Sequence, residues 1–540
     1  MWQQIYTPVL GSIGWSSLVA VLPVFAVLFL LGVLRKPSWM ASVAGLVAAS
    51  LVAIFVYGMP VQLFAGALTY GAATGLFPIG WVVFWAVVLY RVTLETGNFE
   101  IVKNSVGGLT QDRRLQALLI AFAFGAFIEG AAGFGTPVAV AAAMLTGLGF
   151  PPFFAAAICL LANTAPVAFG SIGTPLLMLA NVTALPLGDL SANVGRICAP
   201  VSLIVPAYLI MVMGGFRALK GVLPAAILCG IAFAGTQFYV SNFLGPQLTD
   251  ILASLAAIGG MVVLLKVWKP SDTFHLPGES AVAVHTHYST KQVMMAWAPY
   301  ALLVVLVLLW GMDGVKVMLN KATLTFNWPS LHNEVLRVAP VVAKPSPYPA
   351  SYTLALLSAS GTACMLASIL SALLLGMSPG KFARTVGRTG KDLKLSMLTI
   401  ATVLGLAFLM NYSGATATLG LLFAATGASF PFFSAMLGWL GVFLTGSDTS
   451  ANALFGNLQV VTAGTLHLNP ILMAASNSSG GVMGKMISLQ SIAVAAAATG
   501  MATSDESKLF RFTLKHSIIL SSTLGLIVVF YSYVMPHWVR

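Results

Sequence analysis

Long apolar runs separated by short polar segments dominate the chain. A membrane-spanning helix needs about 20 apolar residues, and most of these runs have that length. Two blocks, 115–187 and 395–503, are apolar but interrupted by clusters of Gly, Pro, Asn, Ser and Thr, which predicts broken or re-entrant helices. The other runs predict single spans at about 16–34, 41–58, 75–93, 197–216, 221–240, 251–267, 294–311, 352–376 and 513–535.

Composition excludes an ordinary soluble protein. The 540 residues are 58% hydrophobic and only 7% charged, with a mean hydropathy of +0.93. A soluble domain carries about 25% charged residues. We therefore predict an all-α polytopic membrane protein with about 12–14 transmembrane or re-entrant helices, and one transmembrane domain over residues 1–540.

Basic residues predict the orientation in the membrane, because Lys and Arg collect in cytoplasmic loops. The chain has 26 Lys and Arg against 14 Asp and Glu, a net charge of +12. These residues lie in short loops between apolar runs, the richest being 381–394, so the excess indicates orientation and not nucleic-acid binding. With the basic loops inside, both termini lie on the extracytoplasmic side, together with 241–250 and a proline-rich loop at 312–350.

The stretch 124–137, F-G-A-F-I-E-G-A-A-G-F-G-T-P, places one carboxyl group inside an apolar run. A carboxylate at membrane depth costs roughly 3 kcal/mol, so Glu129 is expected to have a function. Gly130, Gly133 and Gly135 follow it and allow the backbone to leave helical geometry, which exposes N–H and C=O groups. The alternative is that these glycines only allow two helices to pack closely. That alternative leaves Glu129 unexplained.

The second dense block repeats features of the first. F-I-E-G at 127–130 corresponds to F-L-T-G-S-D at 443–448, and A-N-T-A at 162–165 corresponds to S-N-S-S at 476–479. Asp448 then lies near the position that matches Glu129, and Gly446 matches Gly130. We predict two structural repeats, with cores at about 75–216 and 352–503. Internal duplication of this kind is typical of secondary transporters, whose sites lie where the two halves meet.

Polar side chains inside the two blocks are candidates for binding a small anion. Helix N-termini supply N–H donors and about half a positive charge each. Asn and Ser are good N-cap residues, so each polar group is expected to open a half-helix within the membrane. The alternative is that these side chains only cap and cross-link helices. The candidates for substrate binding are Asn163, Thr164, Asn477, Ser478 and Ser479.

Lys485 is the most informative cation, since it follows Gly480, Gly481 and Gly484 in apolar sequence. Its spacing from Asn477 and Gly481 places the three residues on one helix face, which favours contact with the substrate anion. Snorkelling of the lysine to the membrane interface is the alternative. Gly480 and Gly481, like Gly446, are expected to break a helix.

Glu129 and Asp448 are the candidates for proton coupling. Removal from water favours a neutral carboxyl, while a nearby Lys485 would favour the carboxylate. Ser447, Thr449 and Ser450 can hold Asp448 ionised through hydrogen bonds, although Asp448 can equally be a structural hydrogen-bonding centre. Glu129, with mostly apolar neighbours, is the better proton carrier.

Other classes of chemistry lack their motifs. The four cysteines lie in apolar stretches without paired spacing, and no His-Glu-x-x-His, Walker A or Gly-x-Ser-x-Gly motif occurs. We therefore expect no metal site, no cofactor, no ATP-driven pump and no enzyme. A passive anion channel remains an alternative to a carrier, because glycine-rich helix breaks suit both.

Several long stretches resemble the bacterial lactate permease family, and the likeness covers essentially the whole chain. They include F-G-A-F-I-E-G-A-A-G-F-G-T-P-V-A, L-L-A-N-T-A-P-V-A-F-G-S-I-G-T-P, G-W-L-G-V-F-L-T-G-S-D-T-S-A-N-A-L-F and S-S-G-G-V-M-G-K-M-I-S-L-Q-S-I-A. The resemblance implies a proton-coupled symporter that takes up lactate, and often glycolate, across the bacterial inner membrane. Transport of another small carboxylate is the alternative, and the resemblance indicates no oligomeric state.

A more distant resemblance concerns the paired Asn-Thr and Ser-Asn-Ser segments. They are similar to the Ser-Asn-Thr tips of a large ion-transporter superfamily, in which two re-entrant hairpins belong to inverted repeats. This implies that the two repeats are inverted. The first copy departs from the pattern, since Ala162 stands where Ser is expected.

Overall fold

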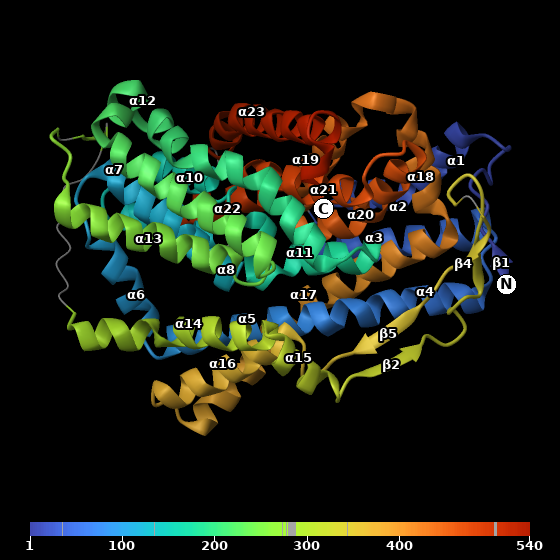
Figure 1. The fold of residues 1–540 in the computed structure, drawn as a ribbon, viewed down its shortest axis with the longest axis horizontal. Coiled ribbons are helices and arrows are strands. Elements are labelled where there is room, and N and C mark those ends of the chain that lie inside the picture. The colour runs from blue at the N-terminus through green and yellow to red at the C-terminus, as the bar shows by residue number, and fades with distance from the viewer. Residues whose placement is uncertain are drawn as a thin grey trace.

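The computed structural model describes residues 1–34, 36–133, 136–272, 274–276, 278, 288–342, 344–501 and 505–539, and it is almost entirely helical (Figure 1). The α-helices are α1 (Ile13–Ala20), α2 (Leu22–Gly32), α3 (Ser38–Leu51), α4 (Val61–Thr74), α5 (Trp81–Glu95), α6 (Asn98–Gly107), α7 (Arg113–Gln116), α8 (Gly125–Ala131), α9 (Thr136–Gly147), α10 (Pro152–Ala162), α11 (Gly170–Thr183), α12 (Leu187–Phe243), α13 (Thr249–Val267), α14 (Thr290–Gly311), α15 (Asp313–Asn320), α16 (Ser360–Leu374), α17 (Pro379–Ser413), α18 (Ala415–Phe423), α19 (Phe430–Thr445), α20 (Asp448–Thr465), α21 (Pro470–Gly484), α22 (Leu489–Thr499) and α23 (Glu506–Tyr533). Wider or tighter helical segments are η1 (Val52–Val56), η2 (Gly75–Gly80), η3 (Ala117–Phe124), η4 (Val167–Phe169), η5 (Ala424–Ser429), η6 (Lys485–Ile487) and η8 (Pro536–Trp538).

The length and composition of these helices confirm the prediction of an all-α polytopic membrane protein. Within the described ranges, 10 helical stretches are long and apolar enough to cross a membrane, or up to 12 if each of two bent pairs makes one span. The bent pairs are α10 with η4 and α11, at 64°, and α21 and η6 with α22, at 42°. They lie in the two dense polar blocks, where broken helices were expected.

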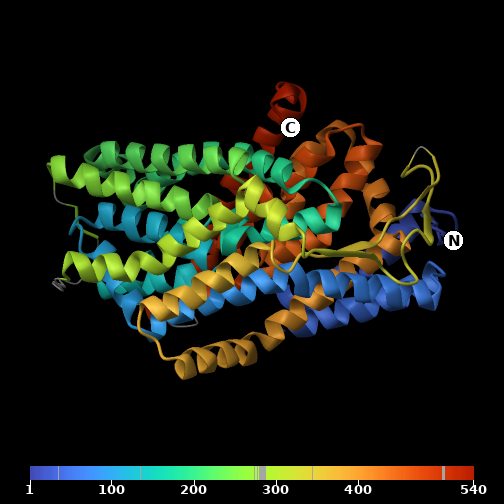
Figure 2. The same cartoon turned by 60° about the horizontal axis from the view of Figure 1, so that its bottom comes forward.

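The 57-residue α12 folds back on itself and supplies two antiparallel spans. Its backbone leaves helical geometry at Gly214, Gly215 and Val222. The Ser191 hydroxyl donates to the Ser241 carbonyl at 2.8 Å, which joins the two far ends. Figure 2 shows both arms of α12 and the neighbouring α13, in green, lying side by side.

The N-terminus and the loop after α14 meet in small β-sheets at one end of the molecule. Strand β1 (Trp2–Gln3) pairs in parallel with β3 (Val335–Arg337), and β4 (Ser346–Pro347) pairs with β3 in the antiparallel sense. Strand β2 (Leu324–Asn327) pairs with β5 (Ser351–Leu354). The loop is therefore folded against the N-terminus, as the yellow and dark blue ribbons show (Figure 1).

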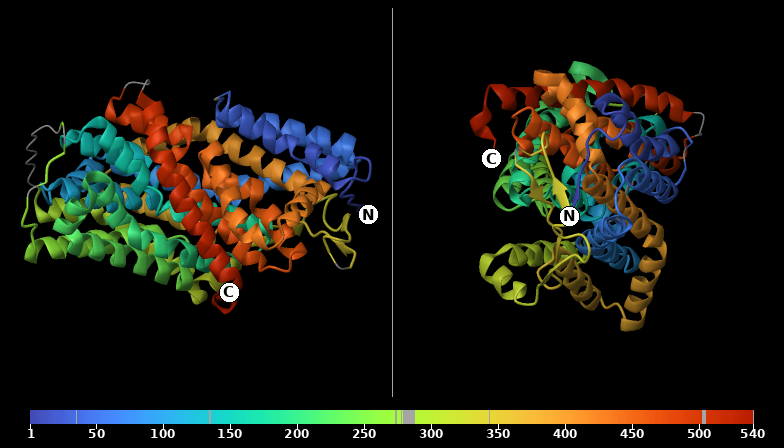
Figure 3. Two further views of the ribbon diagram at one scale, coloured as in Figure 1. Left: turned by 90° about the horizontal axis from the view of Figure 1, so that it is seen from above. Right: turned by 90° about the vertical axis from the view of Figure 1, so that its right-hand side faces the viewer.

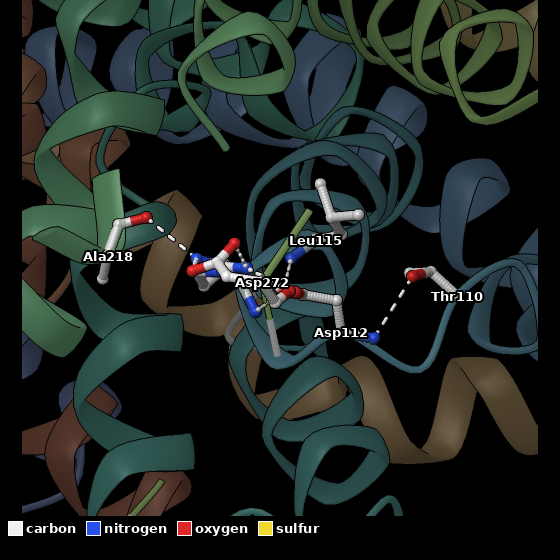
Figure 4. Close-up of polar contacts among 6 residues, drawn as sticks. Thr110, Asp112, Leu115, Ala218 and Asp272 are labelled. Atoms are coloured by element: carbon white, nitrogen blue, oxygen red, sulfur yellow. Dashed lines mark hydrogen bonds and ion pairs between the residues drawn. The ribbon is translucent and has the colours of Figure 1, made fainter. Parts of the chain in front are cut away.

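The buried Arg114 joins three polar segments at the end of the molecule opposite the N-terminus, where α7 lies in Figure 1. Figure 4 shows its partners Asp112, Ala218 and Asp272. Its guanidinium binds Asp112 at 2.7 Å and Asp272 at 2.8 Å, and donates to the Ala218 carbonyl at 3.3 Å. These hydrogen bonds hold the pKa of Asp272 below its usual range. The contacts gather the start of α7, the turn within α12 and the segment after α13, which are three of the basic regions predicted to share one side.

The core has two parts. The larger part is built around η3, α8, α10, α12, α13 and α21, and the smaller part around α2, α3, α4 and α17. Helix α23, in red, lies obliquely across the bundle and contacts α10, α12, α19 and α21 (Figure 3).

One order of elements occurs twice along the chain. A span (113–131) is followed by a break, α9 and a bent pair that begins at Pro152. A second span (415–445), which ends with α19, is followed by a break, α20 and a bent pair that begins at Pro470. Both breaks therefore lie at corresponding points of the two series.

Candidate functional site

Two helix breaks carry the acidic candidates. α8 ends at Ala131, two residues after Glu129, and Gly133 follows with a φ of +60°. α19 ends at Thr445, Gly446 has a φ of +70°, and Asp448 is the first residue of α20. Positive φ values are accessible to glycine at little cost, so both sequences leave the helix where glycine permits it. Gly135, the third expected break residue of the first block, lies outside the described residues.

The expectation that the Asn and Ser groups open half-helices is wrong. Asn163 follows the last residue of α10 and Thr164 lies in the turn after it, while Asn477, Ser478 and Ser479 lie inside α21. Both helices begin earlier, at Pro152 and Pro470, because proline is favoured in the first turn of a helix. No helix N-terminus therefore coincides with these five candidates.

Gly480 and Gly481 also break no helix, contrary to expectation, because they lie within α21. They provide close packing instead. A Cβ atom at Gly480 would lie 2.0 Å from the Ala435 carbonyl oxygen of α19, and one at Gly481 would lie 2.4 Å from Oδ1 of Asp448. Glycine is thus required where α21 meets its neighbours. Gly130 also allows close packing, since a Cβ atom added there would lie 2.8 Å from the Cβ of Asp250.

A buried chain of hydrogen bonds ends on Asp448. Gln459 donates to Asn477 at 3.0 Å, and Asn477 donates to Asn452 at 2.9 Å. Asn452 donates at 3.3 Å and Ser478 at 2.5 Å to the same carboxylate oxygen, Oδ2 of Asp448. Asp448 is thus an acceptor held by two side chains, and Asn477 acts through the amide beside it.

Lys485 points toward the second helix break. It follows the last residue of α21, its Nζ donates to the Gly446 carbonyl at 2.7 Å, and the residue is only 9% exposed. It also interacts electrostatically with both Glu129 and Asp448. The ammonium group is therefore directed into the protein, onto the helix break before Asp448, and not toward an interface.

Glu129, which interacts electrostatically with this cation, is 5% exposed. A Cβ at Gly170, the first residue of α11, would lie 2.6 Å from its Oε1, so the start of the bent half packs directly on the carboxyl group. Asn163 lies beside Glu129, although neither of its amide atoms reaches hydrogen-bonding geometry. The two halves of the chain thus contribute adjoining parts of one polar region.

Unpartnered polar atoms make this region the candidate binding site. Buried polar groups are nearly always hydrogen-bonded, and leaving one without a partner costs about 1–3 kcal/mol. Within the described part of the chain, the buried atoms of this region without a partner include Oε2 of Glu129, both amide atoms of Asn163, Oγ of Ser479 and Oδ1 of Asp448. Such a set of donors and acceptors suits a small polar ligand.

Sequence reasoning missed Asp250, Asn452 and Gln459. Asp250 was placed in a solvated loop, although it is 1% exposed in the first turn of α13. Asn452 lies one helical turn after Asp448, a spacing that places both side chains on one face and could have revealed it. Gln459 shows no such signal, because its contact with Asn477 joins two different helices.

Comparison with known proteins identifies the family. The family described as L-lactate permease matches residues 16–535. The chain belongs to the L-lactate permease family. It is 45% identical over 552 residues to the glycolate permease GlcA of Escherichia coli (strain K12), with 99% of this chain and 98% of that protein covered. It is 46% identical over 542 residues to the L-lactate permease of Bacillus subtilis (strain 168), with 96% of each covered.

Membership of this permease family, together with the apolar helices, makes the chain a multi-pass integral membrane protein. The resemblance noted in the sequence is confirmed. Among solved structures, MtrF of Neisseria gonorrhoeae has a TM-score of 0.50 and 11% sequence identity, with 94% of this chain and 97% of that chain covered. At this identity the likeness concerns the fold alone. It relates the permease to the architecture of another transport protein.

Proposed function

We propose that this permease takes up lactate and related 2-hydroxymonocarboxylates such as glycolate, together with a proton, across a bacterial inner membrane. The observation that carries the proposal is the burial of Lys485, Glu129 and Asp448, which interact electrostatically, beside unpartnered polar atoms. The names of the permease relatives supply the substrate class. The basic loops support an orientation with both termini in the periplasm.

Lys485 and the nearby amide and hydroxyl groups bind the substrate anion. A carboxylate leaving water requires positive charge and hydrogen-bond donors in compensation. The ammonium group supplies the charge, while the unpartnered Asn163 amide and Ser479 hydroxyl supply donors. Asn477 and Ser478 hold Asp448 in place through the hydrogen bonds described above, and Thr164 closes the turn beside Asn163.

Glu129 carries the proton. In the empty site, Glu129 and Asp448 are both ionised, and Lys485 compensates one of their two charges. A bound substrate anion would add a further uncompensated negative charge, and protonation of Glu129 removes it. Asp448 keeps its charge because Asn452 and Ser478 both donate to its Oδ2, although its Oδ1, like Oε2 of Glu129, has no donor among the described residues. Substrate and proton therefore bind together.

The two series of span, break and bent pair form two repeats with cores at about 75–216 and 352–503, arranged in inverted orientation. The site lies where they meet, which suits alternating access around a fixed ligand. The glycine-associated breaks at Gly133 and Gly446 provide the backbone freedom that such a change of access requires.

Uptake of labelled L-lactate into proteoliposomes tests the proposal. An acidic outer medium should drive accumulation, a protonophore should abolish it, and unlabelled glycolate should compete. Glu129→Gln resembles the protonated carboxyl, so this variant should lose proton-driven accumulation and retain pH-insensitive exchange of labelled for unlabelled lactate. Glu100→Gln changes an exposed glutamate paired with Lys103 and is the matched control.

Two results would contradict the proposal. Accumulation by Glu129→Gln along a proton gradient would show that another group carries the proton. Flux through the wild type that never saturates and shows no counterflow would indicate a channel, the alternative left open by the sequence.

A further inference from the structure

Asp250 is a third buried carboxyl group, and neither the substrate nor the Glu129 proton requires it. It is 1% exposed, and neither of its oxygens has a hydrogen-bond partner among the described residues. An ionised carboxylate without a donor is costly away from water. An ionisable residue kept inside a membrane protein despite this energetic cost indicates a function.

Asp250 lies against Gly130, the residue that follows Glu129. Its Cβ is so close to Gly130 that an added Cβ there would approach to 2.8 Å, and it interacts electrostatically with Glu129. Among the described residues, Cys198 of α12 also interacts electrostatically with Asp250. Neither α11 nor η3, which also pack near α13, contains an ionisable residue. Glu129 in turn interacts with Lys485 and Asp448, so Asp250 lies at the edge of the site and not at its centre.

A cavity of about 1050 Å³ reaches the start of the helix that carries Asp250. It is lined on one side by 244–248, the loop immediately before α13, and on the other by residues of α14, α15 and β5. Pro246 of this loop packs 3.0 Å from an added Cβ at Gly173, in the same first turn of α11 whose Gly170 covers Glu129. The cavity wall thus reaches Leu248, two residues before Asp250, and Asp250 packs on Gly130, the residue after Glu129.

We propose that Asp250 relays protons between this cavity and Glu129, an inference that rests on the proposed proton symport. In the inward direction, the Asp250 carboxyl gives its proton to the Glu129 carboxylate. One O–H bond breaks on Asp250 and one forms on Glu129. Asp250 then takes a new proton from water in the cavity. Glu129 can thus remain enclosed and still exchange protons with one side of the membrane.

Asp250→Asn tests the relay, because an amide preserves the shape but cannot transfer the proton. A positioned side chain accelerates proton transfer by roughly 10²-fold or more, so the rate of proton-driven lactate uptake should fall by about a hundredfold. The KM for lactate and the rate of lactate exchange at equal pH on both sides should not change. Asp250→Glu should restore much of the uptake rate. Asp392→Asn, which alters an exposed aspartate paired with Arg91, is the matched control.

Each other outcome overturns the relay. Wild-type uptake rates in Asp250→Asn exclude it directly, and a raised KM would make Asp250 a substrate contact. Equal loss of uptake and exchange would indicate a structural role. If Asp250→Asn and Asp250→Ser both fail to yield folded protein, the carboxyl is required for folding and the relay is rejected. A wild type that transports lactate without responding to the gradient refutes the symport itself, and is distinguished from failure of the relay alone.

Discussion

Replacing Gly480 with alanine distinguishes tight packing from hinge motion at α21. The added Cβ would lie 2.0 Å from the Ala435 carbonyl oxygen, whereas carbon–oxygen contacts are rarely closer than about 3.3 Å. α19 and α21 must therefore separate by about 1.3 Å, or the contact must rearrange. Overpacking of this kind destabilises by about 1–3 kcal/mol.

The displacement should also reach the site. Ser478, two residues before Gly480, donates the 2.5 Å hydrogen bond to Asp448. A shift of about 1 Å in a positioning group can cost roughly 10²-fold in rate, so lactate exchange by Gly480→Ala should fall by about that factor. Both effects have one cause, the approach of the α19 backbone.

Thermal unfolding in detergent, followed by fluorescence-detected size-exclusion chromatography, measures the stability, and exchange in proteoliposomes measures the rate. Gly259→Ala is the matched control, because an added Cβ there meets no described atom within 4 Å. Gly480→Ala with the stability and exchange rate of the wild type would refute the packing argument. Slow exchange at unchanged stability would favour a hinge instead.

Three further predictions concern charges and amides. Lys485→Ala should raise the KM for lactate by about 10–100-fold, the equivalent of one charge-assisted hydrogen bond, and Lys485→Arg should restore part of the lost affinity. An unchanged KM at equal expression argues against contact between Lys485 and the substrate anion. Asn163→Ala and Asn477→Ala should each raise the KM for lactate, and their free-energy effects in the double variant should not simply add if both act on one ligand. Strictly additive effects would indicate separate roles. Because the folded pKa of Asp272 is lowered, its ion pair with Arg114 stabilises the protein above about pH 4, and this stabilisation is lost as the pH falls through the folded pKa. Asp272→Asn should therefore lower the unfolding temperature at pH 7 and match the wild type in strong acid. A difference that does not depend on pH would contradict this prediction.

The sequence by itself determined the class of the protein and several groups of the site. Apolar runs of membrane length and the small number of charges predict a polytopic helical protein, because burial in lipid depends on composition within each segment. The same cost marks Glu129, Asp448 and Lys485, since an ionisable residue in an apolar run is detectable without knowing its neighbours. The breaks near Gly133 and Gly446 were also accessible, because glycine acts on local backbone geometry.

Only the tertiary structure decided which groups lie together. Asp250 follows a polar loop and is indistinguishable in sequence from a solvated residue, yet packing against Gly130 of a distant helix buries it. Gly480 was expected to break a helix, but its role is fixed by the α19 backbone 2.0 Å from its added Cβ. Whether a glycine bends or packs, and whether a carboxyl is solvated or enclosed, depends on atoms from elsewhere in the chain, and local sequence carries no record of them.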